Sequence, residues 1–119
     1  MAYEIIKADG PVLHVRIKGV MLLADQQAMQ AAAKKLIAQG LKPRLLVIAE
    51  NFQGWEKGVD WGDMDFLMDY GDDIVKMAIV GDAKWKEQVF MFTAKGLRKT
   101  IIEYFPPADL ARAEAWVRA

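Results

Sequence analysis

Residues 44–70 read RLLVIAENFQGWEKGVDWGDMDFLMDY and decide the fold of this chain. The segment begins with an apolar run at residues 45–49, which lacks the alternation of a half-exposed strand. Such a strand is typical of a parallel sheet that helices cover on both faces. Ligands of these sheets bind at the loops beyond the carboxyl ends of the strands. We therefore expect a functional surface near the aromatic loop at residues 51–55.

The composition indicates one small globular domain over residues 1–119. Hydrophobic residues make up 54% of the chain and charged residues 27%, which is enough for one core. The formal net charge is zero, so a nucleic-acid partner is not expected. The absence of cysteine excludes disulfides and thiolate metal sites. Without a signal sequence or an apolar run of ~20 residues, a cytoplasmic location is predicted.

Hydrophobic periodicity and turn residues predict alternating strands and helices along the rest of the chain. Strands are expected at residues 3–8, 12–18, 45–49, 74–80 and 100–105, and helices at 23–39, 61–70, 82–95 and after Pro106-Pro107. Gly40 is placed to end the first helix, and Asp82 to cap the third. The prediction is therefore a single-domain α/β fold.

The second strand alternates apolar and polar residues, which predicts one core face and one face in water. His14, the only histidine, falls on the polar face with Arg16 and Lys18. We expect it to be a solvated residue and not a catalytic base, because no nucleophile or orienting partner accompanies it.

Several motifs, taken in order, resemble the SpoIIAA-like family, relatives of the STAS domain of sporulation anti-sigma-factor antagonists. They are Phe52-Gln53-Gly54-Trp55, then Lys76-Met77-Ala78-Ile79-Val80-Gly81-Asp82 with Trp85 three residues on, and Glu114-Ala115-Trp116-Val117. The resemblance implies a STAS-like mixed sheet of four or five strands with about four helices. It also implies an architecture similar to that of the CRAL-TRIO lipid-binding proteins.

The chain departs from the STAS pattern at the switch position. STAS antagonists are switched by phosphorylation of a serine at the start of the helix after the third strand, whereas this sequence contains no serine. Asp60 and Asp63 occupy that region, and Asp60 is interpreted as a helix N-cap. A carboxylate has less charge and fewer acceptor oxygens than a phosphate. A phosphorylation switch is therefore not predicted.

No arrangement of residues indicates catalysis, a metal site or a cofactor. The acids at residues 60–73 do not have the spacing of a calcium loop, and Gly54, Gly58 and Gly62 are not followed by the Lys-Ser/Thr pair of a phosphate-binding loop. We therefore predict no catalytic residue, no metal, no cofactor and no enzymatic activity.

Two predicted helices carry apolar residues on more than one side. In residues 61–70, Phe66 and Tyr70 fall opposite the other apolar residues, and in residues 84–95 Phe90 and Met91 lie outside the main stripe. Such helices are either buried between layers or present a second apolar side to a ligand or partner. The candidate ligand-, membrane- or partner-binding residues are Phe52, Trp55, Trp61, Met64, Phe66, Met68, Tyr70, Phe90 and Met91.

Charge is divided along the chain although its sum is zero. Eight acids and one base, Lys57, lie between Glu50 and Asp73, whereas five bases and one acid, Glu87, lie between Lys84 and Lys99. Two solvated faces would explain this pattern. A basic helix that carries Phe90 and Met91 is also compatible with weak peripheral contact to an anionic membrane.

Two functions remain open from the sequence. The first is a non-enzymatic binding domain for an apolar or amphipathic small molecule or lipid, held in a cavity beneath the helices at residues 61–70 and 84–95. The second is a STAS-like protein-interaction or regulatory module without the phosphorylatable serine, of which a homodimer is a variant.

Overall fold

A computed structural model of the chain describes residues 3–59, 73–93, 95–96 and 99–119. One five-stranded sheet has the order β1-β2-β3-β4-β5, in which β1 is antiparallel to β2 and the other neighbours are parallel. The strands are β1 (Tyr3–Asp9), β2 (Val12–Lys18), β3 (Arg44–Glu50), β4 (Lys76–Val80) and β5 (Ile101–Phe105). The described helices are α1 (Leu23–Ala38), α3 (Lys86–Phe92) and α4 (Leu110–Arg118), with short 3-10 turns η2 (Ala83–Trp85) and η3 (Pro107–Asp109). The prediction of an α/β fold with a mixed sheet is confirmed, and the helix predicted at residues 61–70 lies outside the described residues.

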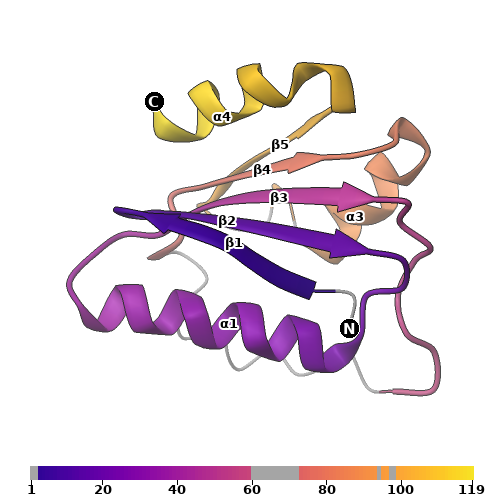
Figure 1. The fold of residues 1–119 in the computed structure, drawn as a ribbon, viewed down its shortest axis with the longest axis horizontal. Coiled ribbons are helices and arrows are strands. Elements are labelled where there is room, and N and C mark those ends of the chain that lie inside the picture. Colours follow the sequence, from indigo (N-terminus) through magenta and orange to yellow (C-terminus); the bar gives the residue numbers. More distant parts are fainter. Residues whose placement is uncertain (1–2, 60–72, 94, 97–98) are drawn as a thin grey trace.

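The helices cover both faces of the sheet, as the apolar run of β3 indicated. Helix α1 lies along one face and α4 along the other (Figure 1). The core on the first face includes Leu13, Val47 and Val89, so α3 packs on the same side as α1. The core on the second face joins Leu46 and Ala78 of the sheet to Ala113 and Val117 of α4. Because side chains of β3 alternate between these two cores, the strand is apolar at every central position.

Helix α1 begins and ends with local hydrogen bonds that its sequence supports. At its start, Asp25 Oδ2 accepts the Leu22 N–H at 2.9 Å. At its end, Gly40 has a φ of 82°, and Leu41 N–H bonds back to the Leu36 carbonyl at 3.0 Å. This pattern is a Schellman motif. It favours glycine because the residue after the helix cap must adopt a left-handed backbone conformation. The predicted termination at Gly40 is confirmed.

The prediction that His14 is solvated is wrong. His14 is only 4% exposed, and Arg118 Nη2 lies 3.3 Å from its Nε2 atom. Helix α4 causes this burial, because its C-terminal end lies over the face of β2 that was expected to be wet. Arginine can only donate hydrogen bonds, so the ring nitrogen serves as the acceptor in this contact.

The C-terminal end of α4 is held by basic residues that begin two strands. Arg44 Nη1 donates to the Val117 carbonyl at 2.8 Å, and Lys76 Nζ donates to the Trp116 carbonyl at 3.1 Å. The last carbonyls of a helix have no partner within the helix and carry partial negative charge, which cations stabilise. These two bonds fasten α4 to the sheet.

Helix α3 is shorter than the sequence predicted. Asp82 does serve as an N-cap, because its Oδ1 accepts the Lys84 N–H at 3.0 Å, but the first turn that it caps is 3-10 in form. The helix then ends at Phe92, before the predicted Lys95. Lys95 N–H bonds to the carbonyl of Phe90, five residues earlier, which is the geometry of a helix end and not of its interior.

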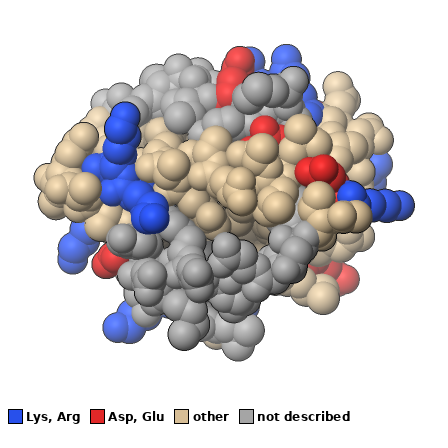
Figure 2. All heavy atoms as spheres, turned by 90° about the horizontal axis from the view of Figure 1, so that it is seen from below, with Lys and Arg blue, Asp and Glu red and all other residues tan. Residues whose placement is uncertain are grey.

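Within the described residues, no helix combines the length and the apolar character needed to cross a membrane. On the face that carries α1, uncharged residues form a broad band (Figure 2). This band agrees with the sequence of α1, which has no charged residue between Asp25 and Lys34.

Candidate functional site

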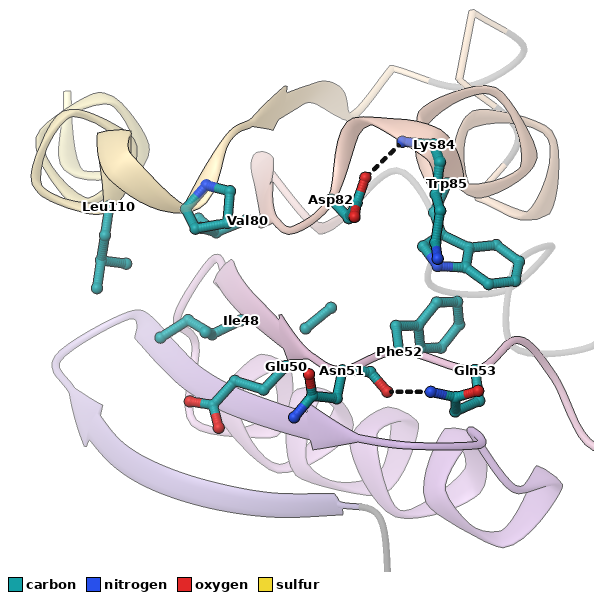
Figure 3. Close-up of a pocket in the computed structure, with 12 residues that line it drawn as sticks. Ile48, Glu50, Asn51, Phe52, Gln53, Val80, Asp82, Lys84, Trp85 and Leu110 are labelled. Carbon is teal, nitrogen blue, oxygen red and sulfur yellow. Dashed lines mark hydrogen bonds between the residues drawn. The ribbon is translucent and has the colours of Figure 1, made fainter.

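An open cleft of about 600 Å³ lies at the carboxyl ends of β3 and β4 (Figure 3). These strands are parallel neighbours in which Ile48 pairs with Val80, so both end at the same edge of the sheet. This is the edge at which the sequence predicted a functional surface. The residues that line the cleft are Ile48, Ala49, Glu50, Asn51, Phe52, Gln53, Val80, Asp82, Lys84, Trp85, Pro107 and Leu110.

The loop after β3 is fixed by backbone bonds to the loop after β2. Met21 N–H donates to the Gly54 carbonyl at 2.9 Å, and Glu56 N–H returns a bond to the Met21 carbonyl at 2.8 Å. Asn51 turns the chain out of β3 with a φ of 46°, a left-handed conformation that asparagine adopts more readily than most residues. The loop therefore enters the cleft with a defined backbone.

Aromatic side chains form one wall of the cleft. The ring centroid of Phe52 lies 5.0 Å from that of Trp85 and 5.1 Å from that of Trp55, and both pairs meet edge to face. The ring centroid of Phe92 lies 5.1 Å from that of Trp55. Edge-to-face pairs add stability beyond the area they bury. Phe52, Trp55 and Trp85 all pack against the core, and of them Phe52 and Trp85 also line the cleft, whereas Trp55 does not.

Tyr104 supports the turn that leads out of β4. Its hydroxyl donates to the Asp82 carbonyl at 2.7 Å. Burial raises the pKa of Tyr104 above its ordinary value of 10.0, and the negative charge of Asp82 raises it further. An ideal Cβ built on Gly81 would lie 2.8 Å from the Tyr104 hydroxyl, so glycine lets the ring approach the backbone here.

The charged groups around the cleft differ in how they are paired. Glu50 faces Arg16 Nε at 3.2 Å and Lys18 Nζ at 3.8 Å. Asp82 uses one oxygen to cap η2. Lys84, in contrast, forms no ion pair with any residue that the structure describes, and its Nζ lies 5.9 Å from the centroid of the Trp85 ring.

The predicted binding residues do not form one surface. Phe52 lines the cleft, whereas Trp55 contacts Phe52 and the core but does not line the cleft. Phe90 is partly buried and meets Tyr104 edge to face at 6.2 Å, whereas Met91 is 82% exposed and does not line the cleft. The residues that lie outside the described part of the chain are Trp61, Met64, Phe66, Met68 and Tyr70. The cavity predicted beneath residues 61–70 therefore stays a prediction.

Sequence reasoning missed most of the residues that line the cleft. The sequence placed Ile48 and Val80 in apolar strands and Leu110 in the helix after Pro106-Pro107, without assigning them to a site. The useful signal was their position, because Val80 ends one apolar strand and Ile48 lies close to the end of the other. The position of Leu110 in the sequence gave no such signal. Leu110 reaches the cleft because the chain turns back toward it after β5.

The two threonine hydroxyls are both engaged in hydrogen bonds to the backbone. The hydroxyls of Thr93 and Thr100 donate to the carbonyls of Val89 and Ile74 at 2.8 and 2.6 Å. Among residues 3–59, 73–93, 95–96 and 99–119, no three histidine, aspartate or glutamate side chains gather closely enough to hold a metal ion. The fold and the cleft thus define a small α/β domain with an open, partly apolar site at the carboxyl edge of its parallel strands.

A family model described as SpoIIAA-like matches residues 12–118, and the chain belongs to this family. A solved structure with a similar fold is an uncharacterised protein of the DUF3478 family from Shewanella loihica PV-4, described as having a SpoIIAA-like fold. The similarity covers 98% of this chain and 92% of that one, with a TM-score of 0.69 and 18% sequence identity. At this identity the likeness concerns the fold alone. No curated protein matches the chain.

Proposed function

We propose that the chain is a non-enzymatic binding domain that holds an amphipathic small molecule in the cleft at the ends of β3 and β4. The observation that carries this proposal is the lining of the cleft. Ile48, Val80 and Leu110 supply apolar surface, and Phe52 and Trp85 supply aromatic surface. Polar groups lie around them, and this combination is characteristic of small-molecule sites.

A neutral solvatochromic dye, Nile red, tests the proposal in two single variants. Leu110→Gln removes apolar surface from the cleft, and Leu41→Gln is its control, because both leucines are 37% exposed and only Leu110 lines the cleft. We expect Leu110→Gln to weaken dye binding about five-fold, since each buried methylene contributes about 0.8 kcal/mol. Leu41→Gln should leave binding unchanged. Absence of dye binding, together with no ligand retained in native mass spectrometry, would refute the proposal.

The alternative function is a STAS-like protein-interaction or regulatory module that lacks the phosphorylatable serine. Membership of the SpoIIAA-like family supports it, as does Met91, whose 82% exposure is unusual for a large apolar residue. Light scattering of the wild type and of Met91→Gln would test the homodimer variant. A monomer in both proteins would count against self-association through this residue.

Two further sequence predictions stay open to experiment. Weak contact with an anionic membrane is tested by co-sedimentation with vesicles. The cytoplasmic location is tested by cell fractionation.

A further inference from the structure

His14 is a buried titratable residue at the point where β2 meets the last turn of α4. It is 4% exposed, and Arg118 Nη2 lies 3.3 Å from its Nε2 atom. Because the Arg118 guanidinium can only donate hydrogen bonds, this contact requires an unprotonated Nε2. A proton on that nitrogen would turn the acceptor into a donor and place two positive charges side by side. The contact therefore forms only while His14 is neutral.

Two cations already occupy the C-terminal end of α4, where a charged His14 would otherwise be stabilised. The last carbonyls of a helix carry partial negative charge, which cations stabilise. Arg44 Nη1 donates to the Val117 carbonyl at 2.8 Å. Lys76 Nζ donates to the Trp116 carbonyl at 3.1 Å. A proton on His14 would therefore add positive charge to a helix end whose carbonyls have cationic partners.

Charges of both signs lie on the elements that pack against the ring. On α4, Glu114 Oε1 lies 3.4 Å from Arg118 Nη2. On β1, Lys7 is opposite His14 in the register, and Asp9 follows two residues later. The charged residues farther along this face of β2 and its neighbouring strands are already ion-paired: Glu4, Arg16, Lys18 and Glu50. Because electrostatic energy falls with separation, the positive charge of Arg118, at hydrogen-bond distance, outweighs this mixed surrounding.

We propose that His14 and Arg118 form an acid-sensitive latch, which holds the C-terminal end of α4 against β2 at neutral pH and releases it when His14 is protonated. An unpaired charge is costly in an apolar interior, so a protonated ring must reach water. It reaches water when the end of α4 moves away. Val117 belongs to the same core as Leu46 and Ala78, so this movement uncovers apolar surface of the sheet. The latch is independent of the cleft and of its ligand.

Proton NMR tests the first step directly, because His14 is the only histidine of the chain. We expect its ring resonances to titrate about one pH unit below the ordinary histidine value of about 6.5. Arg118→Gln should raise this midpoint by about half a pH unit or more, because it removes the adjacent positive charge. Arg112→Gln removes the same charge from α4 at a site paired with Asp109, so it should leave the midpoint unchanged. A wild-type midpoint at or above about 6.5, or no change in Arg118→Gln, would overturn the latch.

Amide hydrogen exchange, corrected for the intrinsic effect of pH, follows the release of α4. Protection of residues 114–118 should fall by up to about ten-fold from about pH 7.5 to about pH 5, while the amides of β3 keep theirs. In His14→Gln a neutral side chain can accept from Arg118 at every pH, so protection of α4 should stay constant. No loss in the wild type, or equal losses in both proteins, would overturn the proposal. If His14→Gln does not fold, the NMR titration of the wild type and of Arg118→Gln decides.

Discussion

The close approach of Gly81 to Tyr104 predicts a specific energetic coupling beside the cleft. A Cβ at position 81 would lie 2.8 Å from the Tyr104 hydroxyl and 3.3 Å from Ala49 Cβ. Gly81 is not among the glycines with positive φ, so its backbone accepts alanine without strain. The cost of Gly81→Ala therefore comes from contact with these neighbours, and most of it from the hydroxyl.

The size of the effect follows from the contacts that would be lost. Gly81→Ala displaces the Tyr104 hydroxyl from the Asp82 carbonyl, which costs about 0.5–1.5 kcal/mol for the hydrogen bond. Crowding against Ala49 and the hydroxyl adds about 1–3 kcal/mol. Tyr104→Phe alone should cost about 1 kcal/mol, because it removes the same hydrogen bond. In the Tyr104→Phe background the added methyl meets no hydroxyl, so Gly81→Ala should then cost about 1–2 kcal/mol less.

A double-mutant cycle measures this coupling. The free energy of unfolding of the wild type, both single variants and the double variant is obtained from urea denaturation followed by tryptophan fluorescence. Gly40→Ala serves as the control, because its added Cβ meets nothing within 4 Å and its cost of about 1 kcal/mol is backbone strain. It should not couple to Tyr104→Phe. If Gly81→Ala and Tyr104→Phe are additive within about 0.5 kcal/mol, the contact argument is refuted.

Two further predictions concern ionisation and the start of α1. Because the pKa of Tyr104 is raised in the folded protein, by burial first and by Asp82 second, its contribution to stability is complete below pH 10.0 and is lost as the pH rises through the folded pKa. Alkaline denaturation should therefore destabilise the wild type more than Tyr104→Phe above pH 10.0, and equal slopes for the two proteins would contradict this assignment. Asp25, only 1% exposed, accepts the Leu22 N–H at the start of α1, so Asp25→Ala should lower the unfolding free energy by about 1–3 kcal/mol. Glu87→Ala, which changes an exposed acid, is the control in thermal denaturation and should lower the unfolding free energy by less than about 0.5 kcal/mol. A similar loss of unfolding free energy in both variants would argue against the stabilising role of the Asp25 hydrogen bond.

Sequence patterns predicted the strands, the end of α1 and the cap of η2 correctly, because these features depend on the properties of residues close together in the chain. The unbroken apolar run of β3 indicated helices on both faces, and α1 and α4 lie there. Gly40 ends α1 because a left-handed residue is needed at that position, and Asp82 caps η2 because its side chain reaches a nearby N–H. Each of these features depends on residues close to one another in sequence.

The length of α3 and the environment of His14 were not predicted, for different physical reasons. Helix α3 ends where its backbone N–H groups stop bonding to the carbonyl four residues earlier. Hydrophobic periodicity along the sequence does not identify that residue. His14 is covered by Arg118, a residue 104 positions away. Alternation along β2 identifies which side chains share a face, but it carries no information about which distant helix covers that face.

The candidate cleft was likewise predicted in part by the sequence and determined in part by tertiary packing. By itself, the sequence determined a domain with parallel apolar strands, and therefore the edge at which their loops gather. Only the tertiary structure decided which side chains meet there, because the register of β3 against β4 brings Ile48 beside Val80 and the return of the chain after β5 brings Leu110 to them. The pairing of Glu50 with Arg16 and Lys18, and the lack of such a partner for Lys84 among the described residues, also arise across strands and loops. Charge and apolar surface are properties of single residues, but a binding site requires their arrangement in space, which long-range packing determines.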